Sequence, residues 1–151
     1  MENIENTELY KQALTGDALA QYNLACKYDH NGQYGEAFFW FEKSALGGNP
    51  RGMYGVAYYY YDGRYVTEDK DLSFYWYKKA AEAGSYLAQR EIVSYFASRI
   101  DRREEIRYLQ MRLNNPELDE YSSSPQDAQE KREMLKSEID HLIWELKTWY
   151  S

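Results

Sequence analysis

The sequence predicts an all-α fold, an α/α superhelical solenoid of two to three helix pairs with a long C-terminal capping helix. The first observation is a repeat. Residues 36–48 and 71–84 are amphipathic stretches that each end in glycine, and their tryptophans, Trp40 and Trp76, are 36 positions apart. A repeat period of this size is typical of helical solenoids. The second observation is an apolar pattern of about two heptads near the C-terminus, which predicts a long final helix.

The first helix of each pair carries one recurring spacing of apolar residues. Residues 7–15 indicate the end of a truncated first unit closed by Gly16, and a helix from Asp17 to about Tyr28 follows. Positions i, i+4, i+5 and i+8 lie on one helical face, so we expect them to be buried. The three sets are Ala20, Leu24, Ala25 and Tyr28; Gly52, Val56, Ala57 and Tyr60; and Ala88, Ile92, Val93 and Phe96. Their small residues permit close contact between paired helices.

The second helix of the middle pair presents a similar face. Its predicted apolar positions are Leu72, Trp76, Tyr77, Ala80 and Ala81. Turn signals at Asn31-Gly32 and Asp62-Gly63 separate the two helices of each pair. Gly48 and Gly84 are expected in the left-handed conformation that closes a helix, which residues with a Cβ resist.

The third pair is degenerate. Asp101 and Glu104 have the spacing of a capping box at the start of its second helix. Ile106, Leu109 and Leu113 continue that helix, but the Lys-Ala-Ala-x-x-Gly ending of the middle pair is missing. Degenerate final units are expected in solenoids because the last helix faces water or a cap.

The C-terminal third contains a loop and a helix. We expect the solenoid to span residues 1–115, with the best repeats in 16–98, then an exposed acidic and serine-rich loop at 116–124 and a helix packed on the solenoid at 125–151. Ser124 is the expected N-cap and Pro125 the first helical residue. The apolar positions of this helix are Leu135, Ile139, Leu142, Leu146 and Trp149. It could cap the solenoid, which we favour, pair with its copy in a homodimer, or form part of a partner site.

Composition excludes some function classes. The net charge of −7 argues against general binding to nucleic acid or anionic membranes, because both need a basic surface. Cys26 is the only cysteine, so an internal disulfide is excluded and a reducing compartment is indicated. The N-terminal residues do not resemble a signal peptide, and no apolar stretch is long enough to span a bilayer. We therefore expect a soluble, cytoplasmic protein.

Several of these residues also match a known repeat. Residues 75–84, their echo at 40–45, and residues 60–66 resemble the SEL-one-like repeat, a relative of the tetratricopeptide repeat. Tyr65 stands where that repeat has its second glycine, and the paired cysteines of some exported bacterial members are absent. The resemblance implies an α/α superhelix that binds proteins and has no catalytic chemistry of its own.

Helical geometry predicts a partner-binding groove. In the first helices, positions opposite the buried face are expected on the concave side of the solenoid. They include Tyr22, Tyr54, Tyr58, Tyr61 and Arg90. Tyrosine and arginine are frequent interface anchors, so these residues are candidate partner contacts, with the groove centred on Tyr54 and Tyr58. The alternative is that the tyrosines pack against the terminal helix or adjacent loops.

An acidic stretch provides a second candidate surface. Glu117, Asp119 and Glu120 would meet a cationic partner and steer its association, or they belong to a solvated loop, which we favour.

We therefore expect a non-enzymatic, adaptor-like module that binds another protein on its concave, tyrosine-rich face, as a monomer or as a homodimer through the C-terminal helix. One alternative is an immunity protein that occludes a basic toxin. Another is a hydrolase, for which Glu138 and His141 form the one Glu-x-x-His pair. We expect no catalytic residues, no metal and no cofactor, because the other ligands of such a site cannot be found in the sequence.

Overall fold

The computed structural model describes residues 3–149, which are all-α as predicted. Among them the helices are α1 (Glu8–Leu14), α2 (Ala18–His30), α3 (Tyr34–Leu46), α4 (Pro50–Asp62), α5 (Lys70–Glu82), α6 (Tyr86–Tyr95), α7 (Arg102–Leu113), α8 (Glu117–Glu120) and α9 (Pro125–Trp149), with 3-10 turns η1 (Ile4–Asn6) and η2 (Ala97–Arg99). No strand occurs in this range. The last two residues of the predicted terminal helix, 150 and 151, lie outside the described residues.

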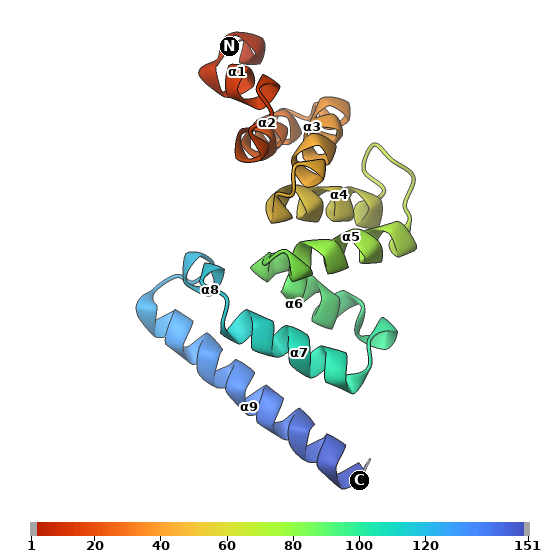
Figure 1. The fold of residues 1–151 in the computed structure, drawn as a ribbon, viewed down its shortest axis with the longest axis vertical. Helices are drawn as coiled ribbons and strands as arrows, with labels where there is room; N and C mark the ends of the chain where they lie inside the picture. The colour runs from red at the N-terminus through yellow and green to blue at the C-terminus, as the bar shows by residue number, and fades with distance from the viewer. Residues whose placement is uncertain (1–2, 150–151) are drawn as a thin grey trace. The chain divides into compact units, whose positions relative to one another are not determined.

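The chain divides into two compact units, unit 1 (Met1–Ala83) and unit 2 (Gly84–Ser151). In unit 1, α1 packs on α2, α2 on α3, α3 on α4 and α4 on α5, with each helix joined to the next as Figure 1 shows. The predicted contact residues account for this stacking. Leu24, Ala25, Val56 and Ala57 are almost completely buried, and the hydroxyl of Ser44 on α3 donates to the carbonyl oxygen of Ala18 at 2.6 Å.

Close approach of α3 and α4 depends on two glycines inside α4. A Cβ at Gly52 would lie 2.8 Å from the backbone nitrogen of Ala45, and a Cβ at Gly55 would overlap the ring of Phe41. Glycine in a helix interior usually costs stability, so here the cost is offset by tighter helix packing. The predicted closing glycines are confirmed: Gly48 and Gly84 have φ angles of +86° and +104°.

Two predicted buried positions were wrong by one residue. Tyr59, with its ring enclosed, replaces Tyr60 as the fully buried tyrosine of α4, and Tyr60 is half-buried. On α5, Leu72 is 41% exposed, whereas its neighbour Ser73 is buried and donates to the carbonyl oxygen of Ala57 at 2.9 Å. The small serine side chain lets the α5 backbone approach α4, and this contact turns Leu72 toward solvent.

In unit 2, α6 packs on α7, and α9 packs on both α7 and α8 (Figure 1). The predicted capping box is present, because Asp101 accepts from the backbone of Glu104 and the Glu104 side chain accepts from the backbone of Asp101. Leu135, Ile139 and Leu142 of α9 are buried in the core of this unit. The predicted apolar seam ends early, because Trp149 is 75% exposed.

The segment predicted as an exposed acidic loop contains the short helix α8. Leu118, in the middle of this segment, is fully buried in the core of unit 2. The hydroxyl of Ser122 donates to the carbonyl oxygen of Leu118 at 2.6 Å, and the predicted N-cap Ser124 accepts from the backbone nitrogen of Asp127 at 3.1 Å. The buried side chain of Leu118 thus anchors this charged stretch to the core of unit 2.

Candidate partner-binding surface

The predicted tyrosines of unit 1, which we call the tyrosine row (Tyr22, Tyr54, Tyr58 and Tyr61), are all half-buried. Each has a neighbour within the unit. The ring of Tyr22 lies 6.1 Å from that of Phe41, and the ring of Tyr54 lies edge-on to that of Tyr77 at 5.4 Å. The Lys70 ammonium is 3.6 Å from the centroid of Tyr61. The row therefore contributes to packing and stays partly exposed.

Tyr58 belongs to a polar cluster around Arg64, in the connection between α4 and α5. The Arg64 guanidinium lies 5.3 Å from the Tyr58 ring and donates to Asp29 Oδ1 at 3.2 Å. Asp29 Oδ1 also accepts from the Tyr59 hydroxyl at 2.6 Å. Burial, and then this hydrogen bond to a carboxylate, raise the pKa of Tyr59 well above its usual value, so the hydroxyl remains a donor. The cluster ties the connection to α2.

Tyr65 on the same connection and Phe39 on α3 are exposed aromatic residues that the groove prediction missed. Tyr65 is 68% exposed and Phe39 is 49% exposed. The Phe39 ring meets the buried Trp40 ring edge-on at 5.1 Å, and the Tyr65 ring lies 6.1 Å from Phe38. We call Phe39, Trp40 and Tyr65 the aromatic patch. These residues line an open depression of about 500 Å³ together with Gly35 and Glu36.

Tyr65 is held in a conformation that tyrosine rarely adopts. Its φ angle is +63°, and it is the one non-glycine residue between 3 and 149 with a positive φ. The left-handed region costs roughly 1–2 kcal/mol for a residue with a Cβ. The departure of Tyr65 from the glycine of the repeat was the sequence signal for this position, because glycine would take the conformation without strain.

The predicted sites in unit 2 are engaged in contacts within the chain. Glu117 Oε2 accepts from the backbone nitrogen of Tyr86 at 3.0 Å, and Asp119 pairs with Arg132 at 2.9 Å. Glu120 is exposed. Arg90 donates through Nε to the buried carboxylate of Glu91 at 3.1 Å. The acidic residues thus hold α6, α8 and α9 in place.

The side chains considered for catalysis or metal binding, such as His141 and Cys26, do not form a common site in the described residues. His141 Nε2 lies 3.4 Å from Glu145, one turn along α9, and its ring stacks on Trp144. Between residues 3 and 149 there is no cluster of three or more His, Cys, Asp or Glu side chains placed to hold a metal ion. Burial raises the pKa of the Cys26 thiol, which keeps it protonated near neutral pH. No helix in the described range is both long and apolar enough to cross a membrane.

Comparison with known proteins gives a match to a repeat model over part of the chain and a similar fold. The chain matches the family described as Sel1 repeat over residues 18–49 and 50–85, which correspond to α2–α3 and α4–α5. A Sel1 repeat protein from Oxalobacter formigenes has a similar crystal structure, with a TM-score of 0.66 and 28% sequence identity over 84% of this chain and 96% of that chain. Comparison with curated proteins gives no match.

A second solved structure supports the fold alone. It is a protective antigen present in uropathogenic Escherichia coli strains that displays an SLR fold, with a TM-score of 0.61 and 22% identity. The alignment covers 89% of this chain and 30% of the antigen, so this chain spans about a third of that protein.

Proposed function

Because this chain carries two Sel1 repeats, over residues 18–49 and 50–85, we propose that it is a non-enzymatic, adaptor-like module that binds a partner protein through unit 1. Sel1 repeat proteins generally mediate protein–protein interaction and are generally non-catalytic scaffolds. The lone Cys26 fits a reducing compartment such as the cytoplasm.

The aromatic patch is the observation that carries this proposal. Exposed aromatic side chains beside a depression are typical of interface anchors, since such rings bury a large area and lose little rotamer freedom. Glycine would adopt the positive φ of Tyr65 with less strain, and yet the chain has an exposed tyrosine at this position. A binding role of the ring would explain this strain. We infer that Tyr65 and Phe39 contact the partner.

The tyrosine row is the second proposed contact surface. Tyr54 and Tyr58 lie half-buried on α4, and their contacts with Tyr77 and Arg64 fix the rings before binding. Preorganised side chains lose little entropy on association. The immunity hypothesis stays an alternative, but two of the acidic residues expected to meet a cationic partner, Glu117 and Asp119, are engaged within the chain.

Affinity capture from the source organism tests the proposal. The bait is the full chain, and the variants are Phe39→Ala with Tyr65→Gly, and Tyr54→Ala with Tyr58→Ala. We expect the wild-type chain to retain one protein in a fixed stoichiometry, and the patch variant to lose it with an unchanged melting temperature. If only the variant with Tyr54→Ala and Tyr58→Ala lost the partner protein, the tyrosine row rather than the aromatic patch would be the contact surface. A wild-type bait that retains no stoichiometric protein would contradict the proposed function.

A further inference from the structure

Unit 2 contains a pocket whose lining differs from the acidic character of the whole chain. The pocket has a volume of about 230 Å³, and its residues come from α6, α7, α9 and the connection between α8 and α9. Three cationic side chains, Arg90, Arg112 and Lys131, line it, against one carboxylate, Glu138. The volume is below the usual range for a small-molecule site, so it suits one or two side chains of a bound peptide.

One wall of the pocket is a pair of stacked tyrosines. The rings of Tyr86 and Tyr121 lie 5.7 Å apart with their planes at 14°. Tyr86 is buried at the start of α6, whereas Tyr121 follows α8 and is partly exposed. The stack offers an apolar face beside the cationic groups.

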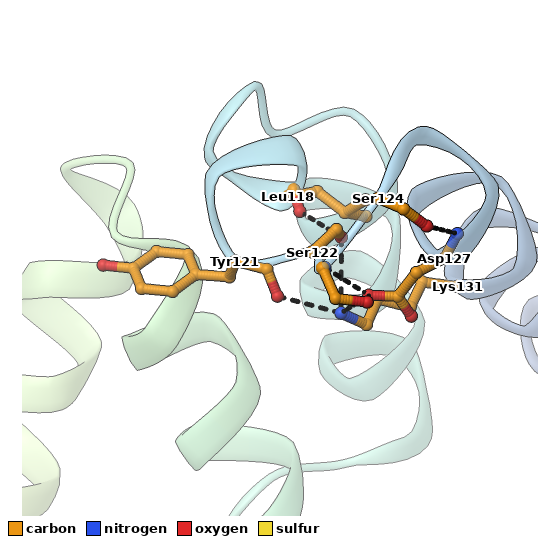
Figure 2. Close-up of polar contacts among 7 residues, drawn as sticks. Leu118, Tyr121, Ser122, Ser124, Asp127 and Lys131 are labelled. Atoms are coloured by element: carbon orange, nitrogen blue, oxygen red, sulfur yellow. Dashed lines mark hydrogen bonds and ion pairs between the residues drawn. The ribbon is translucent and has the colours of Figure 1, made fainter.

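The connection that carries Tyr121 is held by Lys131. As Figure 2 shows, the Lys131 ammonium donates to the carbonyl oxygen of Tyr121 at 2.8 Å and to Asp127 Oδ2 at 2.8 Å, while the Tyr121 ring points away from this cluster. The hydroxyl of Ser122 is a third partner of the ammonium at 3.3 Å. The Lys131 ammonium therefore fixes the position of Tyr121 and is not available to bind a ligand.

Among the three cationic side chains of the pocket, Arg112 is the one that is available to pair with an anionic ligand. Arg90 is committed to the buried carboxylate of Glu91. The Arg112 guanidinium lies 5.5 Å from the ring centroid of Tyr86, and its Nε–H is buried without a hydrogen-bond partner. In the part of the chain that the structure describes, Arg112 makes no ion pair. A buried donor without a partner is uncommon in native proteins and calls for an explanation.

We propose that this pocket, the Arg112 pocket, binds an acidic segment of the partner protein, with a carboxylate on Arg112 and a neighbouring apolar side chain on the Tyr86–Tyr121 stack. The inference rests on the proposed protein-binding function and adds the chemistry of the partner. One guanidinium fork matches one carboxylate in bidentate geometry. A phosphate with two charges would need a second uncommitted cation, which the pocket lacks. Glu138 at the edge opposes the ligand charge and limits its affinity.

Nuclear magnetic resonance of the full chain tests the proposal through the Nε–H signal of Arg112. The probe is the peptide acetyl-Gly-Glu-Phe-Gly-amide, compared with versions that carry Gln or Lys in place of Glu. We expect the Glu peptide to shift the Arg112 Nε–H and Tyr121 ring signals, and the Lys peptide to leave them unchanged. Arg112→Gln should weaken binding about tenfold or more, as expected for loss of a bidentate pair. The control Arg103→Gln, an exposed position on α7 with the same charge change, should leave binding unchanged.

A second variant keeps the test decisive if Arg112→Gln disturbs folding. Glu138→Gln removes the opposing charge at an exposed position, and we expect the Glu peptide to bind several-fold more tightly. Equal shifts with the Glu and Lys peptides, unchanged affinity in Glu138→Gln, or the same response to inorganic phosphate alone would overturn the Arg112 pocket. A captured partner that binds Arg112→Gln as well as wild type would also overturn it and would leave the proposed function standing.

Discussion

At the scale of single residues, Tyr65 combines a strained backbone with an exposed ring. Its φ of +63° stores energy that the surrounding contacts must supply, including the Arg64 cluster one residue earlier in the chain. A Cβ on Gly35 would meet the Tyr65 ring at 3.1 Å, so the ring rests directly on the first turn of α3. Because Gly35 has no side chain, the ring of Tyr65 can pack directly against the α3 backbone.

This strain predicts the order of stability of two variants. Tyr65→Gly and Tyr65→Ala both remove the ring, but alanine keeps the backbone penalty. We expect Tyr65→Gly to have a free energy of unfolding about 1–2 kcal/mol above that of Tyr65→Ala. Urea denaturation of the two proteins measures the difference. Equal stability of the two variants would show that the left-handed conformation costs nothing at this position.

Asp127 predicts a dependence of stability on pH. The Lys131 side chain, and then the backbone N–H of Ser123, hold the pKa of Asp127 below its usual value. A carboxyl group with a lowered folded-state pKa stabilises the fold above its unfolded-state pKa, and this contribution is lost as the pH falls below about 4. We expect Asp127→Asn to be less stable than wild type at pH 7 and to lose less stability on acidification.

The control for this prediction is Asp140→Asn on the exposed side of α9. Asp140 makes no ion pair within the described residues, so its loss should leave the pH dependence of unfolding unchanged. If Asp127→Asn and Asp140→Asn followed the wild-type profile alike, the Lys131–Asp127 contact would contribute nothing to stability.

At the scale of elements, the junction of α3 and α4 depends on side chains that are absent. A Cβ at Gly55 would overlap the ring of Phe41, and both residues lie at the centre of this junction. Helix propensity alone would favour alanine at Gly55 by about 1 kcal/mol. Overpacking typically costs more than this, so we expect the packing effect to dominate.

Gly55→Ala should therefore destabilise the protein by about 1–3 kcal/mol. Phe41→Leu frees space at the same place, so the double variant should be more stable than the sum of the single effects, and a double-mutant cycle measures the coupling. A stabilised Gly55→Ala variant would show that propensity outweighs packing at this junction.

Substitutions on the two faces of α9 should differ in their effect on stability. Leu142 is buried against the core of unit 2, whereas Met134 is exposed. Leu142→Ala should cost about 2–4 kcal/mol, and Met134→Ala should change stability by less than about 0.5 kcal/mol. Light scattering of both variants tests the homodimer alternative. If wild type were a dimer and Leu142→Ala a monomer of equal stability, the buried face of α9 would belong to an interface between chains.

The sequence predicted the paired helices α2 to α7 and the terminal helix α9, because apolar spacing and closing glycines are local signals, but it predicted a loop where α8 forms. It did not predict Tyr59 in place of Tyr60 or Ser73 in place of Leu72. Neighbours in a helix differ by about 100° in direction, and contacts with the next helix decide which of them faces inward. Tyr86 and Tyr121 meet across the chain, so no local pattern indicated the Arg112 pocket.

At the scale of the whole molecule, the chain consists of two compact units that offer different chemistry. Unit 1 holds most of the residues that match the Sel1 repeat model and the aromatic patch, and unit 2 holds the Arg112 pocket. An acidic chain with a net charge of −7 gains little from general attraction to an acidic partner segment. Recognition must therefore come from local contacts with apolar anchors and one guanidinium.

The most direct measurement of this account is amide hydrogen exchange of the full chain, alone and in complex with its captured partner. We expect binding to slow exchange in residues 34–40 and 63–66, which carry the aromatic patch. The same protein with Phe39→Ala and Tyr65→Gly should show no slowing at these amides. Slowed exchange confined to other segments, with residues 34–40 and 63–66 unchanged, would contradict the claim that unit 1 holds its partner through exposed aromatic side chains.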